Sequence, residues 1–258
     1  MDSKSFELLY HDAEQALLQD HLQEALSCIQ GILSDCESPE MNREAESLRQ
    51  DYGMMLTFMA QGGVDPQRAL VHRSLTNRAF ALLDRGARLY RLRHIKDLYA
   101  DIAARHHGTE AEPYEMLATR ADLLREKRAE TRSHSLTDEE ESLLYATYDK
   151  LFEHVWTAPL FHPSDAEELE SFIERQEPAG QALLISAVTL AVLQYFDPQK
   201  YRILLHFCKS ETNEVRARAL TAAVWAYMRF TTRFAQYPDL KDGLSLLSQD
   251  ERLKEELA

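Results

Sequence analysis

Tyr201–Phe230, with the sequence YRILLHFCKSETNEVRARALTAAVWAYMRF, decides the fold of this protein. Its first part carries apolar residues at the three- and four-residue spacing of a helix, among them Tyr201, Leu204 and Phe207. The polar turn SETNE follows, and a second helix, rich in alanine, begins near Val215. A turn this short makes two helices antiparallel neighbours. The stretch therefore predicts a helical hairpin.

The same form precedes this hairpin and begins again after it. Residues 168–196 (ELESFIERQEPAGQALLISAVTLAVLQYF) also read as helix, turn and helix, and the two second helices end at Phe196 and Phe230, 34 residues apart. A third unit begins at Tyr237. Two helices cannot bury an apolar face alone, so such units stack, and small residues let the helices approach closely. Alanines lie where stacked helices would cross: Ala217, Ala219, Ala222, Ala223 and Ala226.

Two family resemblances follow from these patterns. The acidic turn, then Val215-Arg216-x-x-Ala219, then Ala222 and Ala223, resembles a HEAT repeat, and the resemblance covers residues 164–258. Near the N-terminus, DHLQEALSCIQGIL (residues 20–33) resembles the second half of a tetratricopeptide repeat, with Ala13 and Ala25 at the small positions. Both resemblances imply an all-α fold of stacked antiparallel helix pairs, an α-solenoid.

The pattern divides the chain into three parts. We expect a tetratricopeptide-like helical region at 1–105, a linker and polar helix at 106–136, and HEAT-like repeats at 137–258 that continue the first region. Gly86 is expected to break or bend a helix that starts at Asp65-Pro66. Thr137-Asp138-Glu139-Glu140 predicts a capping box. Because the pattern stops inside a helix, we expect an array truncated at its C-terminus or closed unusually by its last helix.

Composition excludes several classes of protein. The chain has 38 Leu and 30 Ala against 7 Val and 7 Ile, with 8 Gly and 8 Pro in 258 residues. Helix formers in this excess argue against a β-sandwich, a barrel, a collagen-like chain and a disordered protein. Scarce and scattered glycines also argue against a phosphate-binding glycine-rich loop.

Charge and cysteine usage bear on partners and compartment. The net charge of −14 repels phosphate backbones, so we expect no nucleic-acid partner. The longest mostly apolar run, 182–196, is too short to span a bilayer, and no signal peptide is visible, so we expect no membrane association. Three cysteines without a CxxC motif (Cys28, Cys36 and Cys208) indicate reduced thiols in a cytoplasmic protein.

No motif indicates catalysis or metal binding. HExxH, GxSxG, GxxxxGK[ST], paired CxxC and ExxH are all absent from the sequence. The pair His106-His107 is expected to be exposed to solvent in a loop, and Glu153-His154, with His162, is expected to have a surface or hydrogen-bonded role. The acidic runs, Asp138–Glu141 and Glu167, Glu168 and Glu170, are expected to stabilise helix N-termini. We therefore expect a protein that is not an enzyme, with no cofactor, no metal and no evident small-molecule substrate.

One basic block interrupts the acidic chain. Residues 65–105 have a net charge of +5, between segments 1–64 at −9 and 134–178 at −10. Its arginines do not form one helical stripe, which disfavours a groove for nucleic acid. Arg85 falls on the apolar face, which indicates either a bend at Gly86 or an arginine paired with a carboxylate. We expect pairing with the acidic segments or exposure to solvent, with docking of a protein as the alternative.

These observations favour a protein–protein interaction scaffold or adaptor. Its concave surface, lined by the second helix of each pair, would bind a partner protein or peptide. Arg216, Arg218 and Tyr227 are the candidate partner-binding residues, because Arg and Tyr are favoured as interface anchors. One alternative is a regulatory module of a larger enzyme with its catalytic part beyond residue 258. A second is a HEAT-like solenoid that binds nucleic acid. The sequence leaves the oligomeric state open.

Overall fold

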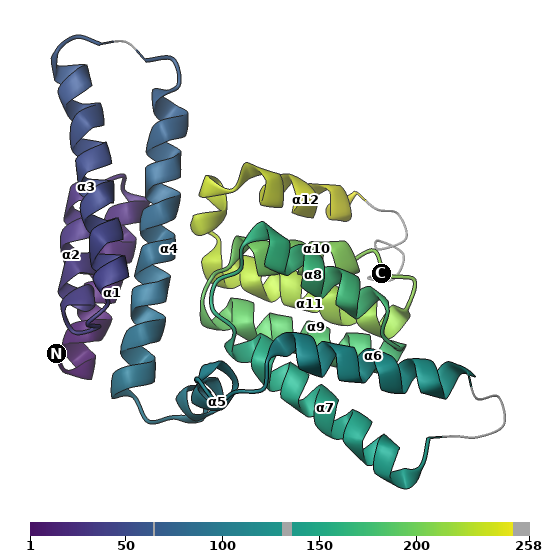
Figure 1. Cartoon of the computed structure of the whole chain (residues 1–258). Coiled ribbons are helices and arrows are strands. Elements are labelled where there is room, and N and C mark those ends of the chain that lie inside the picture. Colours follow the sequence, from purple (N-terminus) through teal and green to yellow (C-terminus); the bar gives the residue numbers. More distant parts are fainter. Residues whose placement is uncertain (64, 131–135, 250–258) are drawn as a thin grey trace. The chain divides into compact units, whose positions relative to one another are not determined.

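The computed structural model describes residues 1–63, 65–130 and 136–249. Within these ranges the chain is all-α, with twelve α-helices, one short 3-10 turn and no strand (Figure 1), as the composition predicted. The chain divides into two compact units, residues 1–96 (unit 1) and residues 97–258 (unit 2), and each has a hydrophobic core of its own. Among the described residues, no helix combines the length and apolar character needed to cross a bilayer.

Unit 1 contains four helices: α1 (Ser3–Leu18), α2 (Leu22–Ser34), α3 (Pro39–Ala60) and α4 (Arg68–His94). Local signals set where α1 and α3 begin. Asp2 caps α1 by accepting a hydrogen bond from the Ser5 amide at 2.8 Å, and Ser38 precedes Pro39 at the first position of α3. Helix α4 begins at Arg68, two residues later than the expected start at Pro66. Asp65 accepts a hydrogen bond from the Gln67 amide, and the helix begins after this turn.

The four helices of unit 1 close into a bundle. Helix α4 packs against α1, α2 and α3, and α2 packs against α1 and α3, so the first and last helices meet. The buried core runs from Ala13 and Leu17 of α1 to Tyr90 of α4, where the Tyr90 ring stacks on Phe6 at 4.1 Å between centroids. This closure differs from an open repeat array, in which a unit contacts only its sequence neighbours.

Gly86 does not break α4. The helix runs without interruption to His94, and a Cβ built on Gly86 would lie 3.1 Å from Leu33 Cδ2 of α2. Glycine in a helix costs about 1 kcal/mol relative to alanine, but here it lets α4 approach α2 closely. The bend expected at this position was therefore wrong, because a close helix crossing explains the glycine instead.

The basic block is paired within each unit. In unit 1, Arg85 forms an ion pair with Glu44, and Arg78 and Arg93 pair with Asp51 at 3.0 Å and Glu37 at 3.3 Å. In unit 2, Arg105 lies 3.7 Å from Glu153. Of the two explanations for Arg85 on an apolar face, pairing with a carboxylate is the one found.

Unit 2 contains the remaining elements: α5 (Leu98–His107), α6 (Tyr114–Glu130), α7 (Asp138–Thr157), α8 (Pro163–Glu174), α9 (Pro178–Gln194), α10 (Pro198–Phe207), α11 (Asn213–Phe230), the 3-10 turn η1 (Arg233–Gln236) and α12 (Pro238–Ser248). Proline occupies the first turn of α8, α9, α10 and α12, where its missing amide hydrogen costs nothing. The predicted capping box is present, since the Glu140 amide donates to Thr137 Oγ1 at 3.2 Å and the Thr137 amide donates to Glu140 at 3.1 Å.

The helices of unit 2 form a row of pairs. The pairs are α6/α7, α8/α9 and α10/α11; second helices α7, α9 and α11 pack in succession, and first helices α8, α10 and α12 do the same. Helix α9 ends at Gln194, two residues before the expected end at Phe196, whereas α11 ends at Phe230 as expected. The Phe196 ring, in the segment after α9, lies 5.4 Å from the Phe230 ring at the end of α11. Helix α12 approaches α10 closely at Gly243, whose Cβ would lie 2.8 Å from Leu205.

The observed division differs from the expected one. Helix α5 buries Tyr99, Ile102 and Ala103 and packs on α7, so it belongs to unit 2 rather than to a region ending at residue 105. Helix α6 contributes Leu117 and Ala121 to the core of unit 2 and is not a linker. The expectation about how the array ends depends on residues 250–258, which lie outside the described residues.

Candidate partner-binding surface

Helices α9 and α11 lie side by side and run in the same direction. Arg218 of α11 donates a hydrogen bond to Ser186 Oγ of α9 at 3.0 Å, and the ring of Phe196, just after α9, meets the ring of Phe230 at the end of α11. Both contacts join residues about one repeat apart in the sequence. The contact that comes later along the first segment also comes later along the second, so the two helices are parallel. This register places Leu190 of α9 level with the middle of α11.

Large apolar side chains are exposed along this helix pair. Leu190 is 40% exposed, Val224 49%, Trp225 56% and Met228 70%, and we call these four residues the α9–α11 strip. The three residues on α11 follow the helical spacing of one face. The opposite face of α11 is buried through small side chains, chiefly Ala219, Ala222, Ala223 and Ala226. Close packing on one side thus leaves the bulky residues on the other side in solvent.

Arg216, one of the three predicted partner-binding residues, is buried. Only 2% of the residue is exposed, and its guanidinium donates to the Ser210 carbonyl at 2.7 Å and to Asn213 Oδ1 at 2.9 Å. Arg216 therefore holds the turn between α10 and α11. The expectation that it is displayed on the surface is corrected, because the first turn of α11 directs this side chain back to the preceding loop.

Arg218 and Tyr227 are placed differently from each other. Arg218 is exposed beside the strip and donates to Glu214 at 2.9 Å as well as to Ser186. Tyr227 is half-buried, and its ring packs edge-on against Phe234 at 5.0 Å between centroids. A role for these two residues in binding a partner stays a prediction. What reaches solvent around them is an exposed arginine and the apolar strip.

Helix α11 has a positive character in an acidic chain. It carries Arg216, Arg218 and Arg229 against a single acidic residue, Glu214. Arg229 is exposed near the end of the helix, with its guanidinium carbon 5.4 Å from the centroid of the Phe230 ring. The apolar strip is therefore flanked by exposed arginines, Arg218 toward one end and Arg229 toward the other.

The paired histidines have internal contacts. His106 and His107 end α5 rather than lying in a loop; His106 Nε2 lies 2.8 Å from Glu153, and His107 Nε2 lies 3.1 Å from Thr157 Oγ1. The His107 ring also packs 4.4 Å from His154. Burial, with a smaller contribution from His106, lowers the pKa of His154 to about 4, so this imidazole is neutral at pH 7.

A pocket of about 260 Å³ opens beside His154 and is lined by α5–α8 and the loop 158–161. A buried ion pair anchors this loop. Lys200 Nζ lies 3.5 Å from Asp197 and donates to the carbonyls of Ala158 and Pro159 at 2.9 and 2.8 Å, while Asp197 accepts from the Phe161 amide at 2.9 Å. Asp197 directly precedes Pro198 and caps α10. Its loop contacts carry no sequence signal, because they join residues about 40 positions apart.

The carboxylates singled out in the sequence have two different roles. Asp138–Glu141 lie in the first turn of α7 as expected, and hydrogen bonds from Lys127 and from the Thr137 backbone hold the pKa of Glu140 below its usual value. In α8 the first-turn acid is Asp165, which accepts from the His162 amide at 2.8 Å. Glu167, Glu168 and Glu170 lie beyond that turn, so the expected N-terminal role is corrected for them.

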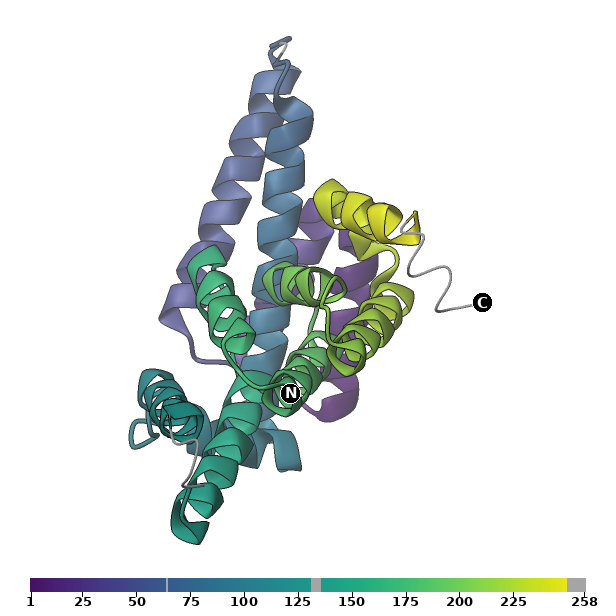
Figure 2. The same ribbon diagram turned by 90° about the vertical axis from the view of Figure 1, so that its right-hand side faces the viewer.

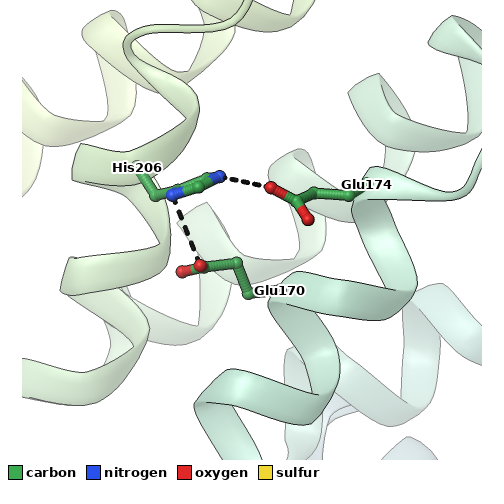
Figure 3. Close-up of side chains that lie close together, drawn as sticks. All are labelled: Glu170, Glu174 and His206. Carbon is green, nitrogen blue, oxygen red and sulfur yellow. Dashed lines mark hydrogen bonds and ion pairs between the residues drawn. The ribbon is translucent and has the colours of Figure 1, made fainter.

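Glu170 belongs to a cluster that the sequence did not reveal. Figure 3 shows Glu170 and Glu174 of α8 facing His206 of α10, with His206 Nδ1 3.3 Å from Glu170 and Nε2 2.8 Å from Glu174. Among the described residues, these three are the set whose ligand atoms lie close enough together, within 4.8 Å, to hold a metal ion. A search for ExxH could not find it, because the histidine lies in the next helix pair. The spacing between successive helix pairs is the sequence signal that could have indicated this cluster.

Comparison with known proteins adds no assignment. No protein family matches this chain, and no curated protein or solved structure is similar to it at a significant level. The surface described above is therefore interpreted from its own geometry.

Proposed function

We propose that this protein is a non-enzymatic scaffold or adaptor that binds a segment of a partner protein on the α9–α11 strip. The observation that carries the proposal is the exposure of Leu190, Val224, Trp225 and Met228 on two adjacent parallel helices. Clustered exposed apolar residues mark interaction sites, and tryptophan is enriched among residues that dominate binding energy. The bound segment would shield these side chains from water.

Charge complementarity indicates the chemistry of the partner segment. Arg218 and Arg229 flank the strip, whereas the whole chain is acidic at −14. The favoured ligand is an amphipathic segment with large apolar side chains bordered by Asp or Glu. Complementary charges at the rim set orientation and specificity more than affinity.

We also propose that unit 2 is HEAT-like, with its second helices as the binding face. The 34-residue spacing and the packing of Phe196 on Phe230 support this reading. The tetratricopeptide-like reading of residues 20–33 has less support, since α4 returns to α1. A cytoplasmic location remains part of the proposal; Cys36 and Cys208 are free and buried, and burial raises the pKa of both thiols, which keeps them unreactive.

A peptide titration tests this function. In a Trp156→Phe variant, Trp225 is the sole tryptophan and reports directly on the strip. An amphipathic helical peptide with leucines flanked by glutamates is expected to shift Trp225 emission to the blue in a saturable manner. A peptide with the same apolar face and lysine in place of glutamate is expected to bind at least about tenfold more weakly.

Capture from the source cell provides the second arm. The full chain is expected to retain a specific protein that a Trp225→Asp, Met228→Asp variant loses. Leu123→Asp is the matched control, because Leu123 of α6 is also exposed, at 62%, and lies outside the strip. Equal retention by all three chains, together with no response to either peptide, would contradict the proposal.

A further inference from the structure

The three residues drawn in Figure 3 join two neighbouring helix pairs of unit 2. Glu170 and Glu174 are four residues apart on α8 and so share one face, and His206 reaches them from α10. All three are at least partly exposed, with His206 and Glu174 the more accessible. The cluster is therefore open to an ion from solvent.

The distances suit a small cation. In a tetrahedral zinc site with ligand bonds of 2.0–2.2 Å, neighbouring ligand atoms lie about 3.3–3.6 Å apart. His206 Nδ1 is 3.3 Å from Glu170 Oε1, and one atom from each residue can be chosen so that all three lie within 4.8 Å of one another. The two carboxylates contact different ring nitrogens, Glu170 at Nδ1 and Glu174 at Nε2, so one of these exposed glutamates turns to the other nitrogen when all three residues bind one ion, with a fourth position left for water.

The charge of the cluster is unbalanced without a cation. Among the described ion pairs, Glu170 and Glu174 both pair with the His206 ring. The nearby arginines pair elsewhere, Arg175 with Asp122 at 3.1 Å and Arg202 with Asp239. A neutral imidazole has one N–H and satisfies one carboxylate, which leaves two negative charges one helical turn apart.

We propose that Glu170, Glu174 and His206 form a binding site for a divalent transition-metal ion of the zinc type, which fastens α8 to α10. The donor set of one imidazole and two carboxylates favours Zn²⁺ or Co²⁺ over Ca²⁺ and Mg²⁺, which prefer all-oxygen shells of higher coordination number. An ion that bridges successive helix pairs stabilises the folded row, because the unfolded chain does not hold the three ligands together.

The test is calorimetric titration of the full chain with ZnCl₂, followed by the visible spectrum of the Co²⁺ form. We expect one ion per chain with a Kd at or below about 100 µM, a tetrahedral Co²⁺ spectrum and no comparable binding of Mg²⁺. His206→Ala, Glu170→Gln and Glu174→Gln should each weaken Zn²⁺ binding at least about tenfold. The midpoint of thermal unfolding should rise with Zn²⁺ in the wild-type chain and not in His206→Ala.

His21→Ala is the matched control. His21 is an exposed histidine beside a single carboxylate, with Nδ1 3.5 Å from Glu24, so it has the same residue types without the third ligand. Its loss should leave Zn²⁺ binding unchanged. Zinc binding that His206→Ala does not weaken, equal weakening by His21→Ala, or Mg²⁺ binding as tight as Zn²⁺ would each overturn the site. Circular dichroism confirms that the variants are folded, which is expected because all the substituted side chains are at least partly exposed.

Discussion

Unit 1 and unit 2 are both built from packed α-helices, but the helices are arranged differently. In unit 1 the last helix, α4, packs back on α1, so the bundle closes and each helix has neighbours on two sides. In unit 2 the second helices α7, α9 and α11 pack one after another (Figures 1 and 2), and α9 and α11 expose apolar side chains. In a closed bundle the apolar side chains are buried between helices and stabilise the fold. In an open row some apolar side chains stay exposed and available to a partner.

The exposed apolar residues of unit 1 have a simpler origin. Helices α3 and α4 have 22 and 27 residues, whereas α1 and α2 have 16 and 13, so the far ends of the long helices are not covered. Met54, Phe58 and Leu70 are exposed there and a pocket of about 440 Å³ forms between the helices. Their exposure follows from unequal helix lengths, while the α9–α11 strip lies on two helices that pack against each other.

The largest expected effect on stability comes from the buried Lys200–Asp197 ion pair of unit 2. Lys200→Met leaves the buried Asp197 carboxylate and two loop carbonyls without their partner, which should lower the free energy of unfolding of unit 2 by about 3–5 kcal/mol. Both tryptophans, Trp156 and Trp225, lie in unit 2, so urea unfolding followed by tryptophan emission measures this unit.

Arg85→Met is the comparison in unit 1. The Arg85–Glu44 pair is half-exposed, so its loss should cost about 1 kcal/mol or less and leave the tryptophan transition unchanged. If Lys200→Met moved the circular dichroism and tryptophan transitions together by the same amount, the two units would unfold as one and the comparison would fail.

The next effect is a pH dependence of stability, which should arise from His154 in unit 2. The pKa of His154 is lowered to about 4 in the folded protein, against about 6.5 unfolded. Between these values the unfolded chain binds the extra proton, so stability should fall as pH drops from 6.5 to 4, by roughly 1–3 kcal/mol after allowance for partial exposure. Tryptophan-detected unfolding at several pH values should show a shallower fall in His154→Phe; an equal fall would contradict the assignment to this residue.

A third pair of variants distinguishes a structural arginine from a surface arginine on one helix. Arg216→Ala removes buried bonds to Ser210 and Asn213 and should destabilise unit 2 by about 1–3 kcal/mol. Arg218→Ala should change stability by less than about 0.5 kcal/mol and should weaken binding of the acidic peptide instead. Urea unfolding and peptide titration of both variants measure this; a destabilisation by Arg218→Ala equal to that of Arg216→Ala would show that the two residues have the same role.

The smallest effect tests a cap. Thr137→Ala removes the hydroxyl that accepts from the Glu140 amide and should cost about 1 kcal/mol in the stability of unit 2. Thr137→Ser keeps the acceptor and should restore most of the loss, as measured by thermal unfolding. In unit 1, Ser38→Ala should cost less, since its bond to the Met41 amide is 3.4 Å long. Equal costs for the two caps would argue against bond geometry as the cause.

Sequence reasoning was most accurate where the interactions are local. The helical content of both units and the capping box at Thr137 depend on residues within one or two turns. It was wrong at Gly86 and at the exposure of Arg216, because each depends on a contact with another segment. The candidate site divides in the same way. Arg218, named from the sequence, is exposed on α11, while the position of Leu190 relative to α11 depends on the register of two packed helices.

By itself, the sequence determined that the protein is all-α, and it predicted that arginines of the basic block, such as Arg78 and Arg85, pair with acidic residues. Periodicity, caps and charge are local or additive properties, so one chain suffices to read them. Only the tertiary structure decided that residues 1–96 close into a bundle while residues 97–258 form a row, and that His206 meets Glu170 and Glu174. These outcomes depend on which apolar faces meet across distant segments, and a helical face has the same pattern whichever partner covers it.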